Sequence, residues 1–386
     1  MNFGTAFYLV SQLPAQVCGA ALLLVFLAQA FVSVRYPQND RHIRAWFSNI
    51  DYRRALWLLA GVVLFALLQV VVLPYALSPF TIVHAALYVV LFGAQRRWRS
   101  AQVSHRALLF IAWLNFAILV ACALPAVREI FFIEKAGGLR FQSYYSEPSV
   151  AAFTYVFNLQ QLWAQRARRG SAAAMAVSLI CLMPTFSGSG LGLLMLLVLA
   201  NFGTGQGVLR SVALLVLMAF ALVVVRFLAA DAFDQMLVAR MQGIVGIGGQ
   251  ADNSTFLRFV APWLFLSDMV GNGNFGWTGV GLGGLVNYVD RNQVHLWFLV
   301  DFNGDTVYAI NNGYAVVLGL FGLPLGILSL IILLVLVYRS PEPRGNKTML
   351  LAYPFFSGYL IHPFIWLLLA DGIWRKAPAP APEAQR

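Results

Sequence analysis

The amino-acid sequence predicts an all-α, polytopic integral membrane protein with about ten transmembrane helices. Three observations lead to this fold class. The chain of 386 residues is 60% hydrophobic and only 11% charged. Its apolar runs are long enough to cross the hydrocarbon core of a bilayer, which needs about 20 residues per helix. Its basic residues gather in alternate loops, as expected for short loops on the cytoplasmic side of a membrane.

The candidate spans are the apolar runs between charged segments. In chain order they lie at 5–34, 55–75, 79–94, 107–126, 149–165, 171–186, 190–202, 211–228, 311–338 and 348–371. The first run is about twice as long as the hydrophobic region of a signal peptide and has no basic segment before it, so we expect a retained span. Residues 1–376 are then a single transmembrane domain, followed by a disordered Ala-Pro tail at 377–386.

The positions of lysine and arginine predict the orientation of these spans. Five alternate loops hold 16 of the 26 basic residues and only three acidic ones, so we assign them to the cytoplasm: 35–54, 95–106, 166–169, 202–210 and 339–347. The net charge of +11 is therefore explained by membrane topology and requires no nucleic-acid partner. Two outer loops, 127–148 and the large loop 229–310, form the opposite face.

Polar residues stand where several predicted helices begin at this outer face. The turn Ser187-Gly188-Ser189-Gly190 joins two short spans and is expected to dip below the outer surface. A helix that begins there presents free N–H groups and a partial positive charge, which favours an anion. The predicted N-caps of the fifth, seventh and ninth helices are Ser146 (with Pro148 in the first turn), Ser187 or Ser189, and Asn311 or Asn312. If these helices are neighbours, their positive ends converge on one outer vestibule; otherwise each is only a well-capped helix.

Arginines in the outer loops strengthen the expectation of an anion site. Arg140 lies in the first loop, and Arg240 and Arg258 flank a glycine-rich stretch of the second. A lone arginine in a loop is usually only solvated. Several guanidinium groups above outward helix N-termini form a clamp for a diphosphate, because the planar guanidinium matches phosphate oxygens. Arg226, at the outer end of a span, is expected to reach the headgroups instead.

Other motifs do not indicate a cofactor. Gly279, Gly281 and Gly284 satisfy the GxGxxG pattern, but they lie in the large outer loop without a strand-turn-helix unit around them, so we expect a glycine-rich turn. His295 is the only histidine in that loop and has no second histidine or cysteine at metal-ligand spacing. The sequence has no P-loop. We therefore expect no cofactor, no metal and no direct use of ATP.

Four motifs occur in order between residues 140 and 322. They are an arginine before an aromatic-Ser-Glu-Pro-Ser helix start (140–149), the FSGSGLG turn (186–192), an arginine and an NSTFLR segment (Arg240, 253–258), and NNGYAVVLGLFG (311–322). In their order and sidedness these motifs resemble the Wzy-type polysaccharide polymerases of the O-antigen polymerase and ligase superfamily. The likeness is strongest to the colanic-acid and xanthan polymerases.

The resemblance implies a GT-C-like helical body in the bacterial inner membrane, with an outward, periplasmic catalytic loop. It implies a metal-independent glycosyltransferase that joins undecaprenyl-diphosphate-linked oligosaccharide repeat units into a long exopolysaccharide or O-antigen chain. The expected partners are the lipid-linked donor and acceptor and the membrane lipids, with a chain-length regulator and a flippase as candidates. The leaving group is an anionic lipid diphosphate, whose charge must be stabilised as the glycosidic bond breaks.

The expected site follows from this chemistry. Arg140, Arg240 and Arg258 are predicted to hold the diphosphate or the developing negative charge. Glu147 is predicted to orient or deprotonate the acceptor hydroxyl; its rival role is to stabilise a helix N-terminus and pair with an arginine. Asp252 or a chain of waters are the other candidate proton acceptors. The predicted substrate-binding residues are Ser146, Ser187, Ser189, Asn311 and Asn312.

Two alternative functions compete with polymerisation. Ligases of the superfamily carry a histidine where this chain has Asn311, before Asn312 and with the same spacing to Gly322, and asparagine cannot act as a general base. A transporter or flippase for the same lipid-linked glycan is expected to contain inverted repeats, and the sequence shows none. Aromatic residues of the large loop either stack on sugars or form an interfacial belt: Trp263, Trp277, Tyr288, Trp297 and Tyr308.

Overall fold

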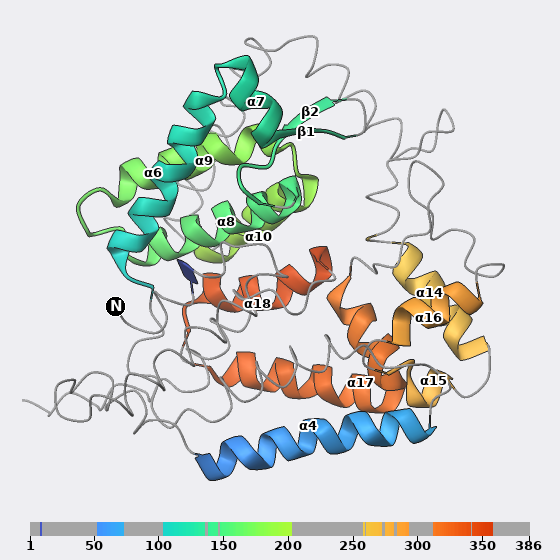
Figure 1. Ribbon diagram of the computed structural model, residues 1–386. Coiled ribbons are helices and arrows are strands. Elements are labelled where there is room, and N and C mark those ends of the chain that lie inside the picture. Colours follow the sequence, from blue (N-terminus) through green and yellow to red (C-terminus); the bar gives the residue numbers. More distant parts are fainter. Residues whose placement is uncertain are drawn as a thin grey trace, which may run out of the picture.

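In the computed structural model the chain is mostly helical (Figure 1). The structure describes residues 8–9, 52–72, 103–135, 138–145, 147–202, 258, 260–271, 275–281, 284–292, 312–340 and 342–357. The helices of these residues are α4 (Tyr52–Val72), α6 (His105–Ala121), α7 (Pro125–Phe131), α8 (Pro148–Ala164), α9 (Ser171–Leu182), the 3-10 turn η1 (Met183–Thr185), α10 (Gly188–Phe202), α14 (Ala261–Gly271), α15 (Phe275–Thr278), α16 (Gly284–Arg291), α17 (Gly313–Arg339) and α18 (Arg344–Phe356).

Most predicted spans that fall on the described residues coincide with helices. The predicted spans 149–165, 171–186 and 190–202 correspond to α8, to α9 with η1, and to α10. The spans at 79–94 and 211–228, and nearly all of 5–34, lie outside the described residues, so the predicted number of spans stays a prediction. By length and apolar composition, one helix in the described part of the chain is able to cross a membrane, Gly313–Arg339. The helices α6 and α10 are apolar but shorter.

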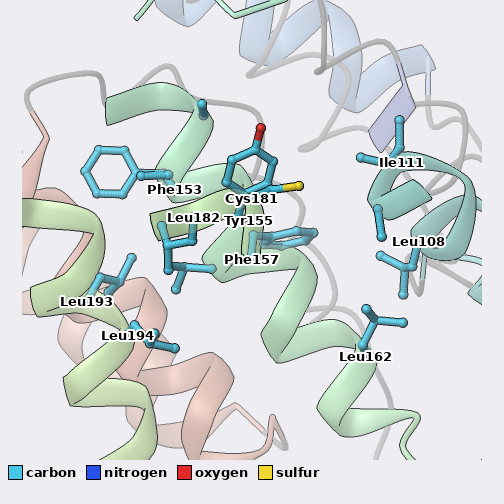
Figure 2. Close-up of a cluster of buried hydrophobic side chains, with 14 of the residues drawn as sticks. Leu108, Ile111, Phe153, Tyr155, Phe157, Leu162, Cys181, Leu182, Leu193 and Leu194 are labelled. Carbon is cyan, nitrogen blue, oxygen red and sulfur yellow. The ribbon is translucent and has the colours of Figure 1, made fainter. Parts of the chain in front are cut away.

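A helical bundle of α6, α8, α9, α10 and α18 contains the main core (Figure 2). Helix α8 contacts the other four, and it buries both apolar and polar side chains on all sides. Tyr155, Phe157 and Leu162 of α8 are fully buried. Figure 2 shows them between Leu108 of α6 and Leu193 of α10. The central position of α8 fixes where its first residue, Pro148, lies.

A short β-hairpin corrects the prediction of a wholly α-helical chain. Strands β1 (Phe132–Lys135) and β2 (Gly138–Phe141) pair antiparallel, with Phe132 opposite Phe141 and Ile133 opposite Arg140. The rings of Phe132 and Phe141 pack with their centroids 5.3 Å apart. Phe132, Ile133 and Phe141 are aromatic or β-branched residues, which favour strands. Part of the predicted outer loop 127–148 is therefore ordered structure, preceded by helix α7.

Helix α17 is bent, whereas the sequence predicts one continuous span at 311–338. Gly322 has φ 73° and ψ 170°, which are not helical angles, and Pro324 follows within the same helix. Pro324 has no N–H for the carbonyl of Leu320, which in a regular helix accepts from the residue four positions later. Figure 1 shows the bend beside α15 and α16.

The glycine-rich turn predicted at 279–284 supplies the missing backbone partners at this bend. Val280 N–H donates to Gly319 O at 2.8 Å, and Gly281 N–H donates to Leu320 O at 3.1 Å. The turn and the bend of α17 are in backbone contact: a Cβ atom on Gly279 would lie 2.4 Å from the Gly322 nitrogen. The prediction of a glycine-rich turn is therefore confirmed for Gly279 and Gly281, whereas Gly284 begins α16. The turn completes hydrogen bonds of α17.

The surfaces of α4 and α17 are strongly apolar. Trp57 and Val71 of α4 are 79% and 84% exposed, and Leu325, Leu328 and Ile332 of α17 are also exposed. The two helices meet through the rings of Phe65 and Phe321, whose centroids are 5.6 Å apart. Large apolar side chains exposed along two helices are what lipid-facing surfaces require.

Candidate functional site

The start of α10 is built by a side-chain-bonded turn. Thr185 Oγ1 donates to Leu182 O at 2.7 Å and accepts from Ser187 N–H at 3.3 Å. Phe186, between them, has a positive φ of 46°, so the chain reverses direction here. Ser187 Oγ then accepts from Gly190 N–H at 3.2 Å, so of the two predicted N-caps, Ser187 and Ser189, Ser187 caps this helix.

The starts of α8 and α10 are adjacent because Gly190 has no side chain. A Cβ atom at Gly190 would lie 2.5 Å from Ala152 Cβ, in the second turn of α8. Small residues at such a contact allow helix backbones to approach closely in membrane proteins. The two N-termini, with their partial positive charges, are therefore held side by side, as the sequence predicted for neighbouring helices.

Arg258 and Asn312 connect the starts of α10 and α17. The guanidinium of Arg258 donates from Nη1 to Ser189 Oγ. Asn312 is the N-cap of α17: its Oδ1 accepts from Tyr314 N–H at 3.1 Å and from Ala315 N–H at 3.2 Å. Its Nδ2 donates to the carbonyls of Arg258, at 3.5 Å, and Phe355, at 3.3 Å. Three segments that are distant in the sequence thus meet at one point, which we call the Arg258 junction (Arg258, Ser187, Ser189 and Asn312).

The prediction that Asn311 or Asn312 caps the ninth helix is confirmed for Asn312. The residue is fully buried, and both ends of its amide are hydrogen-bonded to protein. Its role in the structure is therefore to hold the first turn of α17 against Arg258 and the end of α18. Direct contact of Asn312 with a substrate stays a prediction.

Glu147, and not Ser146, stands at the N-cap position of α8, which corrects one sequence prediction. Pro148 occupies the first helical position, as predicted. Pro at this position fixes the helix start, so the preceding residue is the cap whatever its type. The Glu147 side chain makes no capping bond; its Oε2 accepts from Ser149 Oγ at 3.1 Å. The carboxylate thus lies at the positive end of α8, where a negative charge is stabilised.

Arg140 is brought to the same region by the hairpin. It is only 6% exposed, and its strand β2 contacts η1, the turn that precedes Ser187. The structure therefore places the strand of Arg140 beside the approach to the Arg258 junction. Three predicted site residues, Ser146, Arg240 and Asn311, lie outside the described residues, as does Asp252.

A family model described as WcaD colanic acid polymerase matches residues 129–370. This range is more than half of the chain and includes the hairpin, α8, α10, Arg258 and the start of α17. The chain belongs to the WcaD colanic acid polymerase family. It is therefore a membrane protein of the Wzy-type polysaccharide polymerases, a family that joins oligosaccharide repeat units carried on lipid. No curated protein and no solved structure matches the chain.

A polar network beneath the loop before Glu147 was not predicted from the sequence. Asn115, fully buried on α6, accepts on Oδ1 from Ser143 Oγ at 2.8 Å and from Tyr155 Oη at 3.0 Å. Its Nδ2 donates to Tyr144 Oη at 3.4 Å. The network ties the loop that leads to α8 to the bundle of this polymerase. An asparagine in the middle of an apolar span was the signal that could have revealed it.

The two tyrosines of this loop are not candidate bases. Desolvation by burial raises the pKa of Tyr144, and it raises the pKa of Tyr145 well above the ordinary value. Both phenols are therefore protonated at neutral pH, and their hydroxyls, 3.1 Å apart, serve as hydrogen-bonding groups. Among the described residues near the Arg258 junction, Glu147 remains the candidate proton acceptor.

The aromatic residues of the predicted large loop fall into two groups. Trp263 and Trp277 are 47% and 73% exposed, as either a sugar-stacking or an interfacial role requires. Tyr288 is fully buried and donates its hydroxyl to Asp268 Oδ2 at 2.8 Å, so it belongs to the core of α14–α16, and both predicted roles are wrong for it. Trp297 and Tyr308 lie outside the described residues. Within the described ranges, no group of three or more His, Cys, Asp or Glu residues could hold a metal ion.

Proposed function

We propose that this WcaD-family protein is an inner-membrane, metal-independent polymerase that acts at the periplasmic face. It transfers a glycan from undecaprenyl diphosphate to the sugar end of a second lipid-linked repeat unit. The observation that carries the proposal is the Arg258 junction. There, the guanidinium of Arg258 donates to Ser189 in the first turn of α10. The backbone carbonyl of Arg258 accepts from Asn312, the N-cap of α17.

An anionic leaving group fits this arrangement. The first turns of α10 and α17 contribute partial positive charge, and Arg258 adds a full one. A guanidinium favours phosphate oxygens through paired, charge-assisted hydrogen bonds. Arg140 and Arg240 supply further cations in the proposal. In a site shielded from water, these charges stabilise the diphosphate as it departs.

The proposed reaction is a direct substitution. The acceptor hydroxyl oxygen forms a bond to C1 of the donor sugar, while the bond from C1 to the diphosphate oxygen breaks and its electron pair leaves with the lipid diphosphate. The hydroxyl proton passes to Glu147, whose carboxylate stands at the start of α8. The energy of the new linkage comes from the diphosphate ester, so no nucleotide is consumed.

The proposed binding residues have different tasks. Ser187 and Asn312 cap α10 and α17 and keep their N–H groups directed at one region. Ser189 orients Arg258 through their hydrogen bond. Ser146 and Asn311, adjacent to Glu147 and Asn312, are proposed to contact the sugar or diphosphate of the donor.

The test is an analysis of glycans in cells that lack the protein and are complemented with variants. We expect wild type to restore long chains, and Arg258→Ala to leave single repeat units on undecaprenyl diphosphate at the outer surface. Arg166→Ala is the matched control, because Arg166 is an exposed arginine at the far end of α8. Repeat units confined to the cytoplasmic leaflet would support a flippase instead. Full-length chains left on the lipid diphosphate would support a ligase.

A further inference from the structure

An open surface cavity of about 360 Å³ lies between the end of α10 and the start of α18. Its lining combines cations with apolar side chains: Leu199, Ala200, Arg344, Lys347, Thr348 and Leu351. The cavity is at the opposite end of α10 from Ser189. Ten residues of helix separate Ser189 from Leu199, which corresponds to about 15 Å. This cavity is therefore distinct from the Arg258 junction.

The cavity has a local charge of +2. Arg344 and Lys347 are three positions apart on α18, so they lie on one face of the helix. Lys347 Nζ donates one hydrogen bond, to Tyr338 O at 2.9 Å, which leaves two of its three N–H donors for another ligand. None of the lining residues is acidic. Two cations beside apolar side chains in an open cavity suit an anion that also carries apolar groups.

The nearest acidic residue in the sequence, Glu342, is directed elsewhere. It is 5% exposed, and its Oε2 accepts from Asn346 Nδ2 at 2.5 Å. Asn346 Oδ1 in turn accepts from Gln160 Nε2 of α8 at 3.0 Å. The Glu342 carboxylate thus belongs to an internal polar network, and it does not line the cavity with Arg344 and Lys347.

The same network makes the start of α18 rigid. Gln160 Oε1 also accepts from Asn201 Nδ2 of α10 at 2.9 Å, so one set of amides joins α8, α10 and α18. Gly345 allows this contact, because a Cβ atom there would lie 2.4 Å from Gln160 Nε2. The backbone that carries Arg344 and Lys347 is therefore fixed on both sides, so a ligand does not have to order it.

An apolar path leads away from the cavity along α10. Leu199, in the cavity wall, is 50% exposed, and Leu196 and Met195, about one turn earlier, are 38% and 51% exposed. These side chains form a strip long enough for part of an acyl chain. In a membrane protein, a basic pocket between helices with an apolar strip beside it matches a phospholipid with an anionic headgroup.

We propose that this cavity binds the phosphate of an anionic phospholipid, with Arg344 and Lys347 as the headgroup ligands. The acyl chain lies along Leu199, Leu196 and Met195. Because the basic loop 339–347 is predicted to be cytoplasmic, the lipid belongs to the inner leaflet. The proposal does not depend on the reaction proposed above, because the two sites are at opposite ends of α10.

The test compares lipid retention by the purified full-length protein. The protein is placed in nanodiscs that contain equal amounts of phosphatidylglycerol and phosphatidylcholine, released, and examined by native mass spectrometry. We expect phosphatidylglycerol to be retained at least tenfold over phosphatidylcholine by wild type. We expect this preference to be lost in Arg344→Gln/Lys347→Gln and kept in Arg168→Gln/Arg169→Gln, which removes two exposed charges from another basic loop predicted at the same face.

A cavity-filling variant separates binding from folding and from bulk charge. Thr348→Trp keeps both cations and places a large ring in the lining of the cavity, so it is also expected to lose the retained phosphatidylglycerol. Equal retention by wild type and the Arg344→Gln/Lys347→Gln variant would refute the proposal. An equal loss in the Arg168→Gln/Arg169→Gln control would refute it as well, because the preference would then be a general charge effect. Displacement of the lipid by millimolar inorganic phosphate would also refute it, by assigning the site to a soluble anion.

Discussion

Substitution of Gly190 by alanine should separate the starts of α8 and α10. The new methyl group would lie 2.5 Å from Ala152 Cβ, whereas non-bonded carbon atoms pack best at about 3.5–4.0 Å. The two helices must therefore move apart by about 1 Å. Overpacking of this kind costs about 1–3 kcal/mol. The cost opposes the helix propensity of alanine, which is better than that of glycine by at most about 1 kcal/mol.

The displacement also acts on the candidate site, because Gly190 is three residues from Ser187 and Ala152 is five residues from Glu147. A displacement of about 1 Å in a catalytic arrangement can reduce a rate by about a hundredfold. We therefore expect Gly190→Ala to shorten or abolish the polysaccharide made by complemented cells. The purified variant should also unfold several degrees below wild type in detergent.

Two further variants make this reasoning refutable. Ala152→Gly removes the opposing methyl group, so the double variant Gly190→Ala/Ala152→Gly should recover stability and polymer length. Gly61→Ala is the matched control, because a Cβ atom there meets nothing within 4 Å. The argument fails if Gly190→Ala is as stable and active as Gly61→Ala. It also fails if the effects of Gly190→Ala and Ala152→Gly simply add, since touching residues should be coupled.

Three other changes have defined outcomes. Gly322→Ala places a Cβ atom 2.2 Å from the carbonyl oxygen of Trp277 at a positive φ, so we expect a loss of several kcal/mol in thermal unfolding, against none for Gly271→Ala. Asn115→Ala leaves buried hydroxyl groups without an acceptor, which costs about 1–3 kcal/mol and should lower polymer yield, as measured by unfolding and by surface polysaccharide. Burial raises the pKa of Tyr145 above its ordinary value near 10. The stability that the neutral phenol contributes is therefore fully present below about pH 10 and is lost only as the pH rises through the raised pKa. The unfolding midpoints of wild type and Tyr145→Phe should thus change equally between pH 7 and 9.

The helix starts around the candidate site could be predicted because their signals are local. Pro148 and Ser187 have strong preferences for first-turn and capping positions, and Asn312 caps α17 for the same reason. All three helices were predicted to begin at one face, but their convergence depends on contacts such as that of Gly190 with Ala152, which the sequence alone does not reveal. The predicted N-cap, Ser146, was wrong by one residue. Serine is the better capping residue, but Pro148 decides where the helix begins, so Glu147 stands at the cap.

Other features depend on contacts distant in the sequence. The bend of α17 requires amide groups from residues 280 and 281, about 40 positions earlier, and no local pattern reveals that partnership. The hairpin at 132–141 has strands of only four residues, too short to be distinguished from a loop by periodicity. The apolar composition that identified the spans also concealed Asn115, because its importance comes from Ser143 and Tyr155, which the fold brings to it.

The two hydrogen bonds that join the glycine-rich turn to the bend of α17 are made of main-chain atoms alone. They use the N–H groups of Val280 and Gly281 and carbonyls of α17, so these bonds need no particular side chain. Related polymerases can therefore diversify the neighbouring residues to suit different sugars without losing the joint. What they cannot change is the absence of a Cβ atom at Gly279 and Gly322. Among homologues, we therefore expect glycine at both positions.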